Sequence, residues 1–312
     1  MGGHTIWRHR GWSLSSRILL LGKNGQVGWE LQRALAPLGQ VTALDRSGSD
    51  GLCGDLTDLD GLAATVRQLR PDLIVNAAAH TAVDKAESEP EVAERLNAEA
   101  PAVLAREAAA LGATLVHYST DYVFDGSGQI PWLEDHPTGP LSVYGRGKLA
   151  GEQAIRESGC SHLIFRTSWV YAARGGNFAK TMLRLAAERE RLTVIDDQWG
   201  APTGADLIAD VTAHAIRHLR SRPQDAGTYH LAAGGFTTWF SYATHVLETA
   251  RKMAPTKALA VKDIAPVATE AFPLPAPRPR NSRLNTQRLQ STFDLMLPPW
   301  QQGVDRMLAE IL

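Results

Sequence analysis

Three side chains in this sequence have the types and order needed to donate a proton to a carbonyl oxygen. Tyr144 and Lys148 are four residues apart, so a helix places them on one face, about one turn from each other. A free phenol has a pKa of about 10, and a neighbouring ammonium is expected to lower it and can also bind ribose hydroxyls. Thr120 follows an apolar run and can polarise the same oxygen. We predict Tyr144, Lys148 and Thr120 as catalytic residues of a carbonyl reductase.

A glycine-rich turn upstream supplies the binding site that such chemistry needs. Gly22, Gly25 and Gly28 follow an apolar run and precede a stretch of helical period. In that context they allow a tight turn, close approach of a pyrophosphate and close helix–sheet packing. The pyrophosphate would lie at the helix N-terminus, against the amides of Gln26 and Val27. This order of motifs disfavours the simpler interpretation, a tyrosine and a lysine on an ordinary surface helix.

The end of the second expected strand bears on the choice of nicotinamide. Asp45 lies 17 residues after Gly28, where an acid accepts hydrogen bonds from the adenosine ribose and favours NAD. Its neighbour Arg46 could instead meet a 2′-phosphate, so we expect both NADH and NADPH to serve. Asp55 and Leu56 could flank the adenine, although a surface turn explains them nearly as well.

Strand and helix patterns alternate over the first half of the chain. The expected strands are 17–21, 41–44, 73–76, 114–118 and 163–166, and the expected helices are 27–38, 59–69, 91–111 and 144–155. Strands separated by helices pair in parallel, and ligands bind at their carboxyl ends. Gly22, Asp45, Thr120 and the stretches 76–80 and 166–169 fall at these strand ends. We predict an α/β fold, a Rossmann-type doubly wound parallel sheet with a smaller, interleaved C-terminal substrate domain.

The second half is less regular. We expect helices at 178–187, 207–219 and 304–311, a short strand at 229–231 and an extended proline-rich segment at 272–280. The predicted domains are a dinucleotide-binding domain over 17–172, to which segments around 204–240 return, and a mainly substrate-binding domain over 173–312. Residues 1–16 have no regular period and lack a signal-peptide core, so we expect a disordered extension or a start codon assigned too early.

Composition excludes several classes of function. Basic and acidic residues number 32 and 33 among 312, so no basic surface argues for nucleic acid or for a membrane surface. The apolar runs are too short to span a bilayer. Cys53 and Cys160 match no metal or redox motif and form no disulfide framework, so we predict a cytoplasmic protein.

These motifs resemble the extended short-chain dehydrogenases/reductases and, more narrowly, the family of dTDP-4-dehydrorhamnose reductases. The stretches that carry the resemblance are 22–28, 76–87, 119–124, 144–152, 166–171, 200–203 and 278–284. The last three go beyond generic dinucleotide binding. The resemblance implies the last step of dTDP-L-rhamnose synthesis, in which hydride passes from NAD(P)H to C4 of dTDP-6-deoxy-L-lyxo-4-hexulose and Tyr144 protonates the alkoxide.

The resemblance also implies residue roles. Cofactor contacts fall on the turn amides and on Asp45, Asp55, Leu56, Ala79, His80, Thr81, Tyr118, Tyr144 and Lys148. Substrate contacts fall on Thr120, Asp121 and Trp169. Some members of the family hold Mg²⁺ at a homodimer interface with three glutamates, and the matching positions are Glu30, Asp206 and Glu310. Asp206 is one methylene shorter, and a retained water could fill the gap.

Two alternatives remain open. An epimerase or dehydratase of the same fold would retain NAD⁺ tightly, but a dehydratase wants an Asp–Glu pair after the threonine, and here Asp121 and Tyr122 follow it. A non-catalytic regulatory subunit would bind dinucleotide and a partner enzyme, a reading that the intact Thr–Tyr–Lys set weakens.

Overall fold

The computed structural model describes residues 16–256 and 259–312. The extension expected over residues 1–16 therefore lies, except for Ser16, outside the described residues. Within the described ranges, no helix is both long enough and apolar enough to cross a bilayer.

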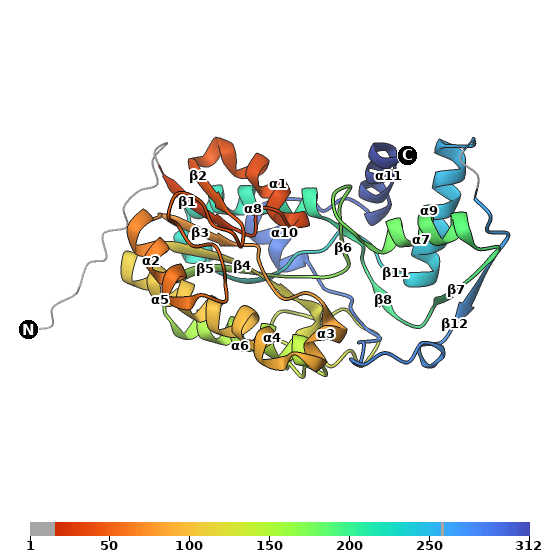
Figure 1. The fold of residues 1–312 in the computed structure, drawn as a ribbon, viewed down its shortest axis with the longest axis horizontal. Helices are drawn as coiled ribbons and strands as arrows, with labels where there is room; N and C mark the ends of the chain where they lie inside the picture. Colours follow the sequence, from red (N-terminus) through yellow and green to blue (C-terminus); the bar gives the residue numbers. More distant parts are fainter. Residues whose placement is uncertain (1–15, 257–258) are drawn as a thin grey trace, which may run out of the picture.

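A six-stranded parallel sheet forms the centre of the larger part of the molecule (Figure 1). In sheet order its strands are β2 (Gln40–Leu44), β1 (Arg17–Leu21), β3 (Leu73–Asn76), β4 (Thr114–Thr120), β5 (Ser161–Thr167) and β10 (Gly227–His230). The chain moves outward from β1 to β2 and then returns to β3 on the other side. A ligand crevice opens where the strand order reverses in this way, at the carboxyl ends of β1 and β3.

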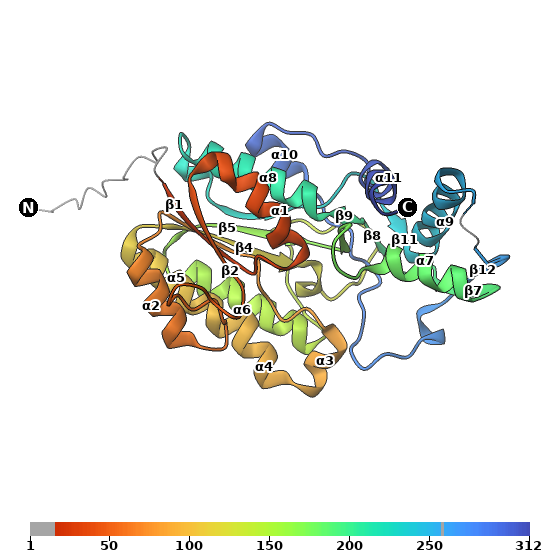
Figure 2. The same ribbon diagram turned by 45° about the horizontal axis from the view of Figure 1, so that its top comes forward.

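Helices cover both faces of this sheet, as Figures 1 and 2 show from two directions. One layer holds α1 (Gln26–Leu35), α8 (Ala205–Leu219) and α10 (Gln287–Phe293), and the other holds α2 (Leu59–Leu69), α5 (Ala100–Leu111) and α6 (Val143–Glu157). The predicted Rossmann-type α/β fold is confirmed. The segment from α8 to β10 packs on and extends this sheet, although it follows parts of the smaller region in sequence.

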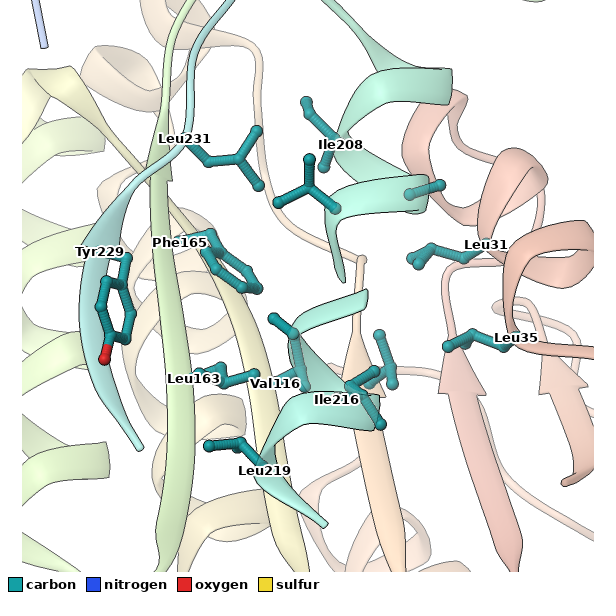
Figure 3. Close-up of a cluster of buried hydrophobic side chains, with 14 of the residues drawn as sticks. Leu31, Leu35, Val116, Leu163, Phe165, Ile208, Ile216, Leu219, Tyr229 and Leu231 are labelled. Carbon is teal, nitrogen blue, oxygen red and sulfur yellow. The ribbon is translucent and has the colours of Figure 1, made fainter. Parts of the chain in front are cut away.

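The packing of α1 and α8 on the sheet forms the largest apolar core (Figure 3). Leu31 and Leu35 of α1 face Ile208 and Ile216 of α8, and all four are essentially excluded from solvent. Phe165 of β5 lies on the sheet side of the same cluster. Each such side chain contributes about 1.5–3 kcal/mol when fully buried. This core therefore fixes the glycine turn, which lies at the start of α1, against the sheet.

The smaller region is built from helices and two-stranded sheets at one end of the molecule (Figure 1). Its elements are α7 (Phe178–Glu188), α9 (Trp239–Met253) and α11 (Trp300–Ile311), with β7 (Arg191–Ile195) paired to β12 (Asp263–Val267) and β8 (Trp199–Gly200) to β11 (Thr237–Thr238). A further pair, β6 (Val170–Tyr171) and β9 (Thr203–Gly204), lies where the two regions meet. Helix α9 was not among the expected helices. The side chain of Thr238 caps it by accepting a hydrogen bond from the Ser241 amide.

The expected helix over 91–111 differs from the observed one. Short helices α3 (Val83–Ser88) and α4 (Pro90–Glu94) come first, and a π-helical turn at Arg95–Glu99 then leads into α5. Pro101 has no amide hydrogen to donate to the carbonyl of Asn97, which favours the wider turn. That carbonyl packs against Gly151 of α6, where any Cβ would collide with it.

Candidate active site

A cavity of about 860 Å³ opens at the carboxyl ends of the central strands. Its size is that of a site for a small molecule or cofactor. Of the residues predicted to be catalytic, cofactor-binding or substrate-binding, all but two line it: Gly22, Gly25, Gln26, Val27, Asp45, Asp55, Leu56, Ala79, Thr81, Tyr118, Thr120, Asp121, Tyr144, Lys148 and Trp169. Residues more than 140 positions apart in sequence are thus brought to one cavity.

The two exceptions support the site from behind. A Cβ on Gly28 would collide with the carbonyl of Gly22, so Gly28 lets α1 pack against the turn. Gly22 itself has φ of +84°, a conformation that favours glycine. The backbone of His80 is clamped by the Asn97 side chain, which accepts from its amide at 2.9 Å and donates to its carbonyl at 3.0 Å. Asn97, which the sequence analysis did not single out, therefore fixes the loop after β3.

Charged residues surround the end of the cavity where adenosine was expected. Asn24 donates to Asp45 Oδ2 at 2.8 Å, and Lys23 Nζ lies 3.6 Å from the same oxygen. Arg46 Nε lies 3.3 Å from Asp55 Oδ2. Although burial acts to raise it, hydrogen bonds from Thr57 and Arg46 hold the pKa of Asp55 below its usual range. Both carboxylates and a guanidinium thus line this end of the cavity.

Tyr144 lies in the first turn of α6, which begins after Ser142 caps it through the Gly145 amide. Its ring meets Tyr122 edge-on at 5.5 Å between centroids. Burial raises the pKa of Tyr144 to about 12, while a hydrogen bond with Thr120 acts in the opposite direction. The predicted net lowering of this pKa beside Lys148 is not seen, because burial dominates. A raised pKa keeps the phenol protonated, which suits a proton donor.

Lys148 is 2% exposed at the same cavity. Burial lowers its pKa to about 8, and the charge of Glu152 acts against that change. Its Nζ lies 3.0 Å from His117 Nε2, and His117 Nδ1 lies 3.3 Å from Asn76 Nδ2. His117 was not predicted as a functional residue. Its only signal in the sequence is an imidazole directly after the apolar pair Leu115 and Val116 of β4.

Thr120 and Asp121 end β4 beside the tyrosine. Thr120 Oγ1 donates to Asp121 Oδ1 at 3.1 Å and also accepts from the Tyr122 amide at 3.2 Å. Burial raises the pKa of Asp121 to about 6, with hydrogen bonds from Ser282 and Thr120 acting in the opposite direction. Ser282 belongs to the expected 278–284 stretch, which therefore reaches the site.

Trp169 reaches the cavity from the boundary between the two regions. Its backbone has φ of +50°, a strained conformation for a tryptophan. Its ring stacks on Trp239 of α9, with centroids 3.5 Å apart and planes 14° apart. Gly200 lies against the same indole, and a Cβ there would collide with the ring. Trp239, which also lines the cavity, was not found from sequence because its helix was not predicted.

The three acids suggested for a shared magnesium ion are not assembled within one chain. Arg306 lies between Asp206 and Glu310, at 3.7 Å and 3.5 Å, and Glu30 lies 3.5 Å from Arg33. Over residues 16–256 and 259–312, no three His, Cys, Asp or Glu side chains cluster to hold a metal ion. The magnesium ion and the homodimer remain predictions, because their site would draw on a second copy.

Comparison with known proteins identifies the family to which this chain belongs. The family model described as "RmlD substrate binding domain" matches residues 16–312. The dTDP-4-dehydrorhamnose reductase of Salmonella typhimurium (strain LT2) is 60% identical over 94% of this chain and 97% of its own. Solved structures of such reductases from Bacillus anthracis str. Ames, in complex with NADP, and from Clostridium acetobutylicum are 35% and 32% identical. Each has a TM-score of 0.83 and covers 95% of this chain and 99% of its own. This chain therefore belongs to the RmlD family, that of the dTDP-4-dehydrorhamnose reductases.

Proposed function

We propose that this protein reduces the C4 keto group of dTDP-6-deoxy-L-lyxo-4-hexulose with NADPH or NADH and forms dTDP-L-rhamnose, with Tyr144 as the proton donor. The observation that carries the proposal is the meeting of Tyr144, Lys148 and Thr120 in the cavity that the glycine turn opens. Family membership supports the reaction, and the geometry supports these residue roles.

The bound nicotinamide would supply hydride, and the chain's residues would do the rest. Thr120 polarises the carbonyl, and Tyr144, kept protonated by burial, gives its proton to the new alkoxide. Lys148 binds the ribose and, with a pKa of about 8, can restore the proton to the phenolate. Asp121 and Trp169 hold the sugar. The stacked Trp169 and Trp239 wall would exclude water from the reacting carbon.

The nucleotide end of the substrate has a candidate site beside this one. A second cavity, of about 440 Å³, is lined by Gly128, Gln129, Asp196, Asp197, Trp199, Arg280 and Arg283. The Arg283 guanidinium lies 5.4 Å from the centroid of the Trp199 ring and has no carboxylate partner among the described residues. Arg283 follows Ser282, which contacts Asp121. A cation and an indole suit a diphosphate and a planar base.

The experiment is cofactor oxidation with substrate generated in situ from dTDP-glucose by its dehydratase and epimerase. We expect NADPH and NADH to be oxidised only with the complete mixture, and dTDP-L-rhamnose to accumulate. Tyr144→Phe is the control for background oxidation. Sugar interconversion by tightly held NAD⁺ without net oxidation would identify an epimerase instead. Dinucleotide binding without any turnover would favour the regulatory-subunit alternative.

A further inference from the structure

Three consecutive residues, Gln198, Trp199 and Gly200, link the two cavities. Trp199 lines the smaller cavity, of about 440 Å³. Its two neighbours contact the tryptophan pair of the larger cavity: Gly200 lies against the Trp169 indole, and Gln198 Oε1 accepts a hydrogen bond from Trp239 Nε1 at 3.1 Å. Successive side chains of an extended chain point to opposite sides. The flanking residues therefore serve one cavity and the central residue serves the other.

A chain of hydrogen bonds continues from Gln198 away from the tryptophans. Gln198 Nε2 donates to Thr269 Oγ1 at 3.1 Å. Thr269 in turn donates to Asp197 Oδ1, from its hydroxyl at 2.6 Å and from its amide at 3.0 Å. Gln198 is 5% exposed, and a buried amide that loses a partner is costly. The glutamine side chain is therefore held in one orientation from both ends.

The direction of these hydrogen bonds follows from the indole. An indole N–H can only donate, so the oxygen of the Gln198 amide must face Trp239. The NH₂ group is then left for Thr269, whose hydroxyl proton is directed at the Asp197 carboxylate. A glutamine supplies both the acceptor and the donor that this position uses. A leucine supplies neither, and a glutamate supplies the acceptor alone.

We propose that Gln198 is a positioning residue that holds the Trp239 indole against Trp169 and thereby fixes the wall that the sugar of the substrate contacts. The two rings are 3.5 Å apart between centroids and 14° from parallel. Stacking favours such planes but leaves the rings free to slide and turn within them. A directional hydrogen bond at Nε1 fixes one edge of the Trp239 ring. The placing of the indole stands without the proposed function, whereas its effect on sugar binding rests on it.

The other contacts of the pair lack this directionality. Phe178 packs on Trp239 with centroids 4.5 Å apart and planes tilted by 48°, an apolar contact. Trp169 has the strained φ of +50°, and its ring contacts Gly200 and Trp239. Such strain persists where the surroundings over-determine the conformation. Loss of the Gln198 bond should therefore loosen both indoles.

The direct test is hydrogen exchange of the Trp239 indole N–H in the intact, ligand-free protein, followed by ¹⁵N–¹H NMR and assigned through its bonds to the backbone. We expect slow exchange, because this N–H is bonded to a buried amide. Trp29, which is 46% exposed, is the internal reference for an indole in contact with water. Equal exchange of the two signals overturns the proposal. The measurement uses the wild-type protein, so it does not depend on any variant folding.

Two variants of Gln198 test its effect on the pair and on the substrate. Stacked indoles give an exciton couplet in the far-ultraviolet circular dichroism spectrum, and Trp239→Phe defines the spectrum without it. The couplet should weaken in Gln198→Leu and return in Gln198→Glu, which still offers an oxygen to the indole. The KM for the sugar nucleotide should rise about 3–10-fold in Gln198→Leu, as expected for one lost hydrogen bond. The KM for NADPH should stay at the wild-type value, and kcat should change less than the sugar KM.

Gln290→Leu is the matched control. Gln290 Nε2 also donates to a threonine hydroxyl, that of Thr286 at 3.0 Å, but Gln290 is not among the residues that line either cavity. This variant should keep the couplet and both KM values. A full couplet in Gln198→Leu overturns the positioning role, whether or not the protein reduces the proposed sugar. A weakened couplet with an unchanged KM, in protein that does reduce it, overturns the role of the pair in sugar binding.

Discussion

Two buried charged residues of α6, Lys148 and Glu152, lie one helical turn apart in contrasting surroundings. Glu152 is fully buried and receives two hydrogen bonds from Arg166, at 2.8 and 2.7 Å, and one from Arg156 at 2.9 Å. Although burial acts to raise it, these arginines hold the pKa of Glu152 low. Among the described residues, the one hydrogen-bond partner of Lys148 is the imidazole of His117. One side chain is a fixed charge and the other is poised to change its charge.

The difference shows how one helix serves both structure and chemistry. A buried charge with a complete set of partners stays ionised and links elements, and Arg166 extends this link by donating to the carbonyl of Glu134. A buried charge without a counter-ion titrates near neutral pH, which a proton-transfer site requires. The turn of α6 nearest the cavity carries Lys148, which can titrate, and the next turn carries Glu152, which stays ionised.

We expect the largest effect from a change at the cavity that leaves the buried ion pairs of α6 intact. We predict that Tyr144→Phe lowers kcat by about 10²–10⁴-fold, the usual contribution of a positioned general acid. NADPH binding, measured by fluorescence titration, should survive because the glycine turn is untouched. Stability should change little, since the phenol hydroxyl bonds with Thr120 of the same catalytic cluster. Wild-type turnover by this variant would show that another group supplies the proton.

Removing Glu152 tests the structural role of the buried ion pair with Arg166. We predict that Glu152→Ala lowers the free energy of unfolding by about 3–5 kcal/mol, because Arg166 is left buried with no counter-ion. Urea unfolding measures this change. Glu188→Ala is the matched control: Glu188 also pairs with an arginine at 3.1 Å but is 53% exposed, so its loss should cost less than about 1 kcal/mol. Equal losses for the two variants would contradict the role given to burial.

The regular elements of the sheet were the parts that sequence could predict. The strand at 73–76 and the helix at 59–69 were expected with their observed bounds, because apolar period and flanking proline mark them locally. Helix α9 was missed although its buried residues, among them Tyr242, Val246 and Leu247, do recur with helical period. The π-helical turn before α5 was missed although Pro101 marks it in the sequence; the close approach of the Asn97 carbonyl to Gly151 of another helix is the part that only the fold shows.

The site was predictable where a motif carries its own spacing. The glycine turn and the Tyr144–Lys148 pair are local patterns, and they line the cavity as expected. His117 lies 31 residues before Lys148, a separation that corresponds to no helix or strand period. Only the pairing of β4 with its neighbours, and the packing of α6 on it, brings the two side chains together. Trp239 reaches Trp169 in the same non-local way.

Asp121 is a second buried charge at the cavity, and its removal should change stability in a pH-dependent way. Asp121 has its pKa raised to about 6 by burial, above the usual 3.8. The folded state therefore holds a proton that the unfolded state loses between these values, so stability falls as pH rises through that window. Two pKa units correspond to about 3 kcal/mol. Asp121→Asn should thus raise stability by up to about 3 kcal/mol at pH 7.5 and by little at pH 4, while turnover falls.

Unfolding free energies of the wild type and of Asp121→Asn at both pH values check this prediction. The gain must appear only above the window. A variant that is equally stabilised at pH 4 would show that packing, rather than the buried charge, accounts for the change. Opposite movements of stability and activity are common where a site holds a group in an unfavourable environment.

The smallest effect concerns an exposed charge at the far end of the same cavity. Arg46 pairs with Asp55 at the edge of the cavity. Its side chain is 83% exposed, so water and salt screen most of its interactions. A 2′-phosphate is a double charge close to it, whereas a hydroxyl is not, so Arg46→Ala should weaken NADPH binding by about tenfold or less and leave NADH binding nearly unchanged. The ratio of the two dissociation constants at low salt measures the effect, which should shrink as salt is raised.

Arg191→Ala, which removes an exposed arginine paired with Asp263 at 3.1 Å in the smaller region, is the matched control and should leave the ratio unchanged. An unchanged ratio in Arg46→Ala would mean that Asp45 and its partners Asn24 and Lys23 set the preference, and that exposure had removed this arginine from recognition altogether.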